Sequence, residues 1–140
     1  MTKTEKVRKI IRLARKYLGK PYVYGAKLYL APKVFDCSSF IQYLYKKVGV
    51  ELPRTALDQA SEGKIIEPIE SKLEPGDLIF IKGGWGHYNP EFPEGIGHVA
   101  LYVGKGKVIN ARGEAKKVIE EKVTDFLTRK DLRVIKRILI

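Results

Sequence analysis

Several residue types are scarce in this chain of 140 residues, and each shortage excludes a class of protein. A single cysteine excludes an internal disulfide framework and a zinc site built from several cysteines. No apolar run approaches the roughly 20 residues that a membrane-spanning helix needs. The first segment, MTKTEKVRKIIRLARKYLG, mixes apolar with charged side chains, unlike a signal peptide. We therefore expect a cytoplasmic protein without a transmembrane segment, unless an export signal was removed from this chain.

Asparagine, glutamine and methionine are also rare, whereas lysine, glutamate and isoleucine are abundant, and the formal net charge is +11. A basic surface favours anionic polymers such as nucleic acid, a wall polymer or a membrane face. The same composition is typical of heat-adapted proteins, in which surface charges form ion pairs. We expect a thermostable protein, in which the thermolabile types Cys37 and Asn110 stand out.

Helical periodicity characterises the first part of the chain and strand alternation the second. Apolar residues at helical spacing predict helices over 4–18 and 36–48, and a shorter helix is predicted over 52–64. Strand patterns follow within 74–84, 98–111, 115–123 and 131–140, the second of them a hairpin with a Gly-Lys-Gly turn. Helices followed by an antiparallel sheet indicate the α+β class, in one domain over 1–140.

The only cysteine lies where an extended segment is predicted to turn into a helix, in FDCSSFIQYLYKKVG. Asp36 or a neighbouring serine would cap this helix and place Cys37 in its first turn. The unpaired N–H groups and the dipole of a helix N-terminus stabilise a thiolate and lower a thiol pKa. Cys37 is also in phase with the apolar stripe of the helix, so an inert packing role remains open.

A cysteine nucleophile needs a base, and the chain contains only His87 and His98. His98 begins a predicted strand and is the expected base. His87 lies in the loop 83–96, rich in Gly, Pro and aromatics, which we expect to form a rim or lid with Trp85 and Tyr88 as substrate contacts.

The predicted hairpin brings a partner to His98. If Val103 pairs with Lys107, Asn110 lies on the same sheet face as His98, one diagonal step away. Asn110 would then accept a hydrogen bond from the Nδ1–H of His98 and leave Nε2 toward the sulfur. Both side chains would face the helix that carries Cys37.

Five segments, in order, resemble the NlpC-type cell-wall peptidases: GKPYVYGA, FDCSSFIQYLY, LPRTALDQ, EPGDLIFI and GHVALYVGKGKVINA. The resemblance covers nearly the whole chain. It implies a papain-like fold, in which N-terminal helices pack on a C-terminal antiparallel sheet and the nucleophilic cysteine begins a helix. It also implies one catalytic domain that uses no metal and no cofactor.

Residue by residue, the resemblance implies Cys37 as nucleophile, His98 as general base and Asn110 as a third polar residue that is more often a histidine. Tyr22 matches a tyrosine near the nucleophile that would help the Cys37 N–H hold an oxyanion. The further expected oxyanion- and substrate-binding residues are Ser38 and Trp85. The chain departs from the family at Ser39 and Ala26, which replace glycines, and in a longer loop over 25–35.

The resemblance implies a monomeric cysteine endopeptidase that hydrolyses peptide or isopeptide bonds of peptidoglycan stem peptides, of the γ-D-glutamyl–diamino acid type. One alternative keeps the triad but cleaves a lipid or acyl ester, for which the basic amphipathic helix 4–18 would suit a membrane interface. Another is a nucleic-acid-binding module with a structural cysteine. We expect no nucleic-acid partner, because the aromatic residues do not interleave with the basic runs.

Overall fold

The computed structural model describes the whole chain and begins with helix α1 (Lys3–Lys16). Thr2 and Glu5 form a capping box, in which each side chain accepts a hydrogen bond from the other residue's N–H. The face toward the domain buries Ile10 and Ala14 completely. The amphipathic pattern therefore reflects packing within the domain, and no helix is both long and apolar enough to span a membrane.

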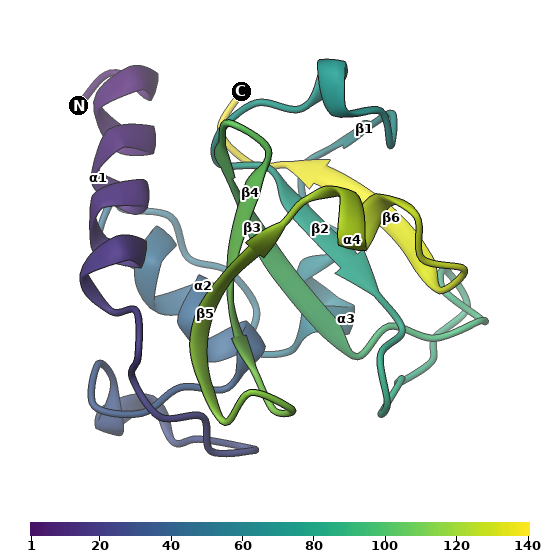
Figure 1. Ribbon diagram of the computed structural model, residues 1–140, viewed down its shortest axis with the longest axis horizontal. Coiled ribbons are helices and arrows are strands. Elements are labelled where there is room, and N and C mark those ends of the chain that lie inside the picture. Colours follow the sequence, from purple (N-terminus) through teal and green to yellow (C-terminus); the bar gives the residue numbers. More distant parts are fainter.

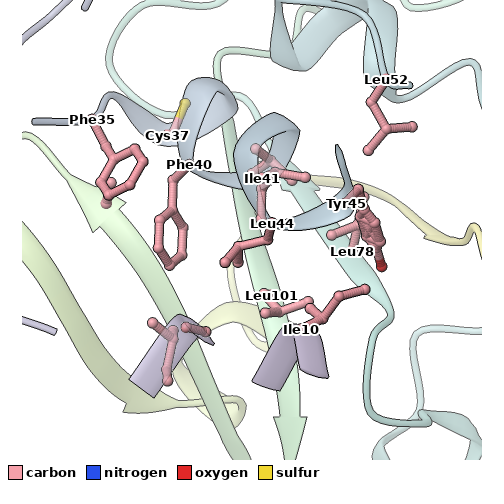
Figure 2. Close-up of a cluster of buried hydrophobic side chains, with 14 of the residues drawn as sticks. Ile10, Phe35, Cys37, Phe40, Ile41, Leu44, Tyr45, Leu52, Leu78 and Leu101 are labelled. Atoms are coloured by element: carbon pink, nitrogen blue, oxygen red, sulfur yellow. The ribbon is translucent and has the colours of Figure 1, made fainter. Parts of the chain in front are cut away.

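Helix α2 (Cys37–Lys46) packs on the sheet and also contacts α1. Phe40, Ile41 and Leu44 are fully buried in the main core, and each contributes about 1.5–3 kcal/mol by leaving water. Figure 2 shows their side chains among those of the sheet and α1. The chain leaves the helix through Gly49, whose φ of +81° suits glycine.

The sheet has six antiparallel strands in the order β1-β6-β2-β3-β4-β5 (Figure 1). Their bounds are β1 Lys64–Ile66, β2 Leu78–Ile81, β3 His98–Gly104, β4 Lys107–Arg112, β5 Lys117–Lys122 and β6 Leu132–Arg137. The last strand therefore lies inside the sheet, between β1 and β2. This arrangement confirms the predicted α+β class.

The two faces of the sheet bury different side chains. Val99 and Leu101 of β3 join the main core with α2, whereas Ala100 and Tyr102 join a second cluster on the other face. A short helix, α4 (Thr124–Leu127), covers this second cluster with Phe126. The alternation follows from the two-residue period of a strand.

The helix predicted over 52–64 is wrong in length. Only α3 (Ala56–Gln59) forms there, capped by the Thr55 side chain, and Lys64 already begins β1. Between them Gly63 has a φ of +76°, and an added Cβ would lie 2.5 Å from the Arg137 carbonyl oxygen. Glycine therefore allows the chain to leave the helix and pair with β6.

Three further short elements lay outside the predictions. They are α4 and the 3-10 turns Leu28–Leu30 and Glu70–Lys72. The loop 83–96 contains a short antiparallel bridge, in which His87 and Ile96 exchange two backbone hydrogen bonds of 2.9 Å. That bridge holds the two arms of the loop together.

Candidate active site

Cys37 is the first residue of α2, and the residues around it fix the start of the helix. Asp36 is the cap, since its Oδ1 accepts a hydrogen bond of 2.8 Å from the Ser39 N–H. Ser39 returns the contact, because its Oγ accepts from the Asp36 N–H at 2.9 Å. The serine at this position, a departure from the family pattern, thus completes a capping box.

The Cys37 sulfur points away from the apolar side chains of the main core (Figure 2). It lines a cavity of about 280 Å³, and the residue is 8% exposed. The thiol donates a long hydrogen bond of 3.8 Å to the carbonyl oxygen of Gly97, the residue before His98. No hydrogen bond joins sulfur and imidazole, so the backbone at the start of β3 is what the thiol contacts in this structure.

The predicted lowering of the thiol pKa is wrong for this structure. Burial, together with the nearby Asp36 carboxylate, raises the pKa of Cys37 to about 12. The backbone N–H groups of Val99 and Ser38 and the charge of Arg54 act in the opposite direction but are outweighed. The resting thiol therefore keeps its proton at neutral pH and must lose it during reaction.

Arg54 joins the loop before α3 to the cap of α2. Its Nη2 donates to Asp36 Oδ2 at 2.7 Å and to the Ala26 carbonyl at 2.8 Å, and its Nη1 donates to Ser38 Oγ at 2.9 Å. Ser38, expected near the oxyanion, is thus held by Arg54 and lines the Cys37 cavity. Sequence reasoning did not select Arg54, although it lies within LPRTALDQ.

His98 and Asn110 are brought together as the register predicted. Leu101 pairs with Ile109, and extending this register places Asn110 diagonally from His98. Only the turn differs from the prediction, because Lys107 pairs with Gly104 and not with Val103. The Asn110 Oδ1 lies 2.6 Å from His98 Nε2. The predicted hydrogen bond is present, but through the other ring nitrogen, so Nδ1 is the nitrogen left free.

The predicted sheet face was wrong. His98 and Asn110 lie on the face opposite the α2 core, because Val99 and Ile109, their strand neighbours, occupy the α2 side. The His98 ring stacks on Phe126 of α4, with ring centroids 6.4 Å apart. Cys37 therefore does not face His98 across the sheet, and the link between them is Gly97, which accepts the thiol hydrogen bond and directly precedes His98 at the start of β3.

Burial lowers the pKa of His98, although the hydrogen bond that His98 donates to Asn110 partly opposes this. The imidazole is therefore neutral at neutral pH. With the proton on Nε2 and Asn110 accepting it, Nδ1 carries the lone pair of a base. Asn110 is itself fully buried and donates through Nδ2 to Glu121, a residue that no sequence motif indicated.

Tyr22 lies between two cavities. It lines both the Cys37 cavity and a larger one of about 640 Å³ that contains His98. Burial and the neighbouring Cys37 raise its pKa to about 12, so its hydroxyl stays a donor. Trp85 also lines both cavities and is 78% exposed, while His87 lines only the cavity of Cys37.

No group of three or more His, Cys, Asp or Glu side chains lies close enough together to hold a metal ion. The geometry instead combines a buried thiol at a helix start, a neutral imidazole hydrogen-bonded to an asparagine, and a tyrosine that lines the cavities of both. These are the parts that acyl transfer by a cysteine nucleophile requires.

The NlpC/P60 family model matches residues 19–137. This chain belongs to the NlpC/P60 family. Its sequence is 40% identical over 103 residues to the probable endopeptidase p60 of Listeria monocytogenes, covering 74% of this chain and 18% of p60. It is 35% identical over 135 residues to the peptidoglycan endopeptidase RipB of Mycobacterium tuberculosis, covering 86% of this chain and 51% of RipB.

The solved structure of RipB superimposes with a TM-score of 0.76 at 30% identity, covering 99% of this chain and 67% of that one. The papain-like arrangement expected from the sequence is thereby confirmed. The chain spans about a fifth of the length of p60 and about half of RipB. The NlpC/P60 domain is thus the part that this chain shares with these longer proteins.

Proposed function

We propose that residues 1–140 form a single catalytic domain of a cysteine peptidase that hydrolyses peptidoglycan stem peptides. The bond proposed is a peptide or isopeptide bond of the γ-D-glutamyl–diamino acid type. The observation that carries the proposal is the hydrogen-bonded pair of His98 and Asn110 at the strand end that the Cys37 thiol contacts. The name of p60 supports an endopeptidase reaction, and the name of RipB supports both that reaction and a peptidoglycan substrate.

The reaction begins with a neutral Cys37 thiol and a neutral His98 imidazole. As the Cys37 sulfur attacks the scissile carbonyl, its proton passes to Nδ1 of His98, and the carbonyl oxygen becomes an oxyanion. The Cys37 N–H, free at the helix start, and the Tyr22 hydroxyl are the donors for that oxygen. Collapse of the intermediate breaks the carbon–nitrogen bond, and His98 returns the proton to the leaving amine.

A thioester between Cys37 and the acyl part of the substrate remains. Water, deprotonated by His98, attacks it, releases the carboxylic acid and restores the thiol. Because His98 protonates the leaving nitrogen, the leaving amino acid belongs on the His98 side, in the larger cavity. The acyl part belongs beside Cys37 and Arg54.

The test is digestion of defined muropeptides by the purified chain, with products identified by mass spectrometry. The expected result is cleavage at the γ-D-glutamyl bond into two fragments whose masses add up to the mass of the substrate plus one water. Intact muropeptides, together with cleavage of a fatty-acyl or thioester substrate, would instead identify an acyl-ester hydrolase on the same triad. Intact substrates of both kinds would contradict a thiol hydrolase.

The pH profile of kcat/KM is expected to keep its plateau into weakly acidic conditions. His98 must be neutral to accept the thiol proton, and burial holds its pKa below the ordinary 6.5. As the pH falls, protonation of His98 therefore removes activity only below pH 6.5. An acid limb with its midpoint above 6.5, unchanged in His87→Ala, would contradict the assignment of His98 as a buried neutral base.

Arg54→Met is expected to lower kcat/KM about tenfold or more, because a neighbouring charge shifts a pKa by about one unit or more. The substitution keeps bulk but leaves the Asp36 carboxylate without its partner beside Cys37, which raises the thiol pKa further. Arg15→Met is the matched control, because Arg15 pairs with Glu120 on the exposed surface. Rates of Cys37 alkylation across pH measure the shift directly, and equal rates in the two variants would exclude this role.

A further inference from the structure

The amide of Asn110 is fully buried and has polar partners at both ends. Its Oδ1 lies 2.6 Å from His98 Nε2, and its Nδ2 donates to Glu121 Oε2 at 2.9 Å. A second, longer contact of Nδ2 reaches the Ile119 carbonyl at 3.5 Å. We propose that Glu121 is a positioning residue, which fixes the orientation of the Asn110 amide and thereby the tautomer of His98.

The orientation matters because an asparagine amide has two ends of nearly equal shape and opposite hydrogen-bonding character. Turned over, Asn110 would present its NH₂ group to Nε2, which would then have to be unprotonated. The imidazole proton would move to Nδ1, the nitrogen that must accept the thiol proton. A single flip of a buried amide would thus convert the base into a group unable to take a proton.

Glu121 prevents that flip because an ionised carboxylate only accepts hydrogen bonds. Only one orientation of Asn110 places a donor against it. The register of β4 and β5 brings Glu121 to Asn110. Glu121 of β5 pairs with Val108 of β4, and Asn110 of β4 pairs with Ile119 of β5. The side chains of Glu121 and Asn110 are therefore diagonal neighbours on one face of the sheet.

Arg112 holds the Glu121 carboxylate in place. Its Nη1 donates to Glu121 Oε1, while its Nε donates to Glu114 at 2.7 Å. Each Glu121 oxygen therefore receives one donor, one from Asn110 and one from Arg112. This division makes the carboxylate irreplaceable by an amide: a glutamine at this position would point an NH₂ group at one of two donors.

The inference rests on the proposed hydrolase activity, and the test separates the two. Glu121→Gln is expected to lower kcat about tenfold at unchanged KM, at the lower end of the roughly ten- to hundredfold loss seen when the outer partners that orient metal-binding histidines are removed. Glu120→Gln is the matched control on the same strand, because Glu120 is exposed and pairs with Arg15. Its kcat should stay within about twofold of the parent value, because Glu120 contacts neither His98 nor Asn110 and surface substitutions usually change folding stability little.

A rescue distinguishes positioning from a merely structural role. Asn110→Asp alone sets two carboxylates against each other and is expected to cost about a hundredfold, since like charges at contact shift pKa values by units. In the double variant of Asn110→Asp and Glu121→Gln, the new glutamine can donate a hydrogen bond to the new aspartate through its NH₂ group and accept one from Arg112 through its oxygen. The double variant should recover at least tenfold over Asn110→Asp; no recovery would overturn the proposal.

The tautomer can be read without any turnover. The chain has two histidines, so ¹⁵N-histidine labelling gives two pairs of ring-nitrogen signals, and the pair that remains in His87→Ala belongs to His98. The His98 proton should be on Nε2 in the parent and in Glu120→Gln, and shared with Nδ1 in Glu121→Gln. A proton fixed on Nε2 in folded Glu121→Gln would overturn the positioning role of Glu121, whether or not the parent protein cleaves muropeptides. If the tautomers are as expected but the parent cleaves nothing, only the proposed hydrolase function is refuted.

Discussion

Cys37→Ala is expected to remove hydrolysis of muropeptides completely while leaving the fold intact. The loss should be on the order of 10⁶-fold in kcat, as for other enzymes deprived of their nucleophile. The fold should tolerate the change because the sulfur points into a cavity and makes a single long polar contact, with Gly97. The measurement is product formation by mass spectrometry together with the thermal melting temperature.

Cys37→Ser is the companion variant. It keeps a polar atom of similar position but offers a weaker nucleophile, so it should be nearly as inactive as the alanine variant. Residual turnover above background in purified, folded Cys37→Ala would refute the nucleophile. A large fall in melting temperature in both variants would instead indicate that the thiol is mainly a packing residue.

His98→Ala is expected to lower kcat by about 10⁴-fold, the upper range for a general acid–base group. His98 lies at the end of β3 that the thiol contacts, and its ring is aligned by Asn110 and Phe126. The substitution removes the acceptor of the thiol proton and the donor to the leaving amine. Single-turnover rates, which report acylation, should fall by the same factor.

His87→Ala is a demanding control, because His87 lines the same cavity as Cys37. It should change KM more than kcat and leave kcat within about tenfold, since the imidazole is exposed, lies on the loop and has no hydrogen-bonded partner that orients its ring. If His87→Ala were inactive and His98→Ala active, the base would be His87, and the role of Asn110 would fall with the assignment.

Local sequence patterns predicted much of the fold. Alternating apolar residues and the glycines at 104 and 106 predicted the hairpin of β3 and β4, and its register placed Asn110 beside His98. The helical spacing of Phe40, Ile41 and Leu44 predicted α2 with Cys37 at its start. These features depend on residues near one another in sequence, which is why periodicity finds them.

The remaining features depend on the tertiary structure. The pKa of Cys37 is set by how deeply the sheet buries the thiol, which outweighs the helix N-terminus. The ring nitrogen that meets Asn110, and the face that the pair occupies, follow from strand packing that no local motif specifies. The contact of Glu121 with Asn110 can be recognised only once β5 is known to lie beside β4. In the sequence alone, a glutamate in a charged strand is an ordinary surface residue.

Strand β6 lies between β1 and β2, although it is the last of the six along the chain. During synthesis, β2 to β5 emerge in an order that lets each strand pair with the one before it. The other edge of β2 stays open until residues 132–137 leave the ribosome, and an open edge readily pairs with strands of other chains. Every residue of the candidate site precedes β6. A nascent chain therefore contains Cys37, His98 and Asn110 while its sheet still lacks β6 and can pair with strands of other chains.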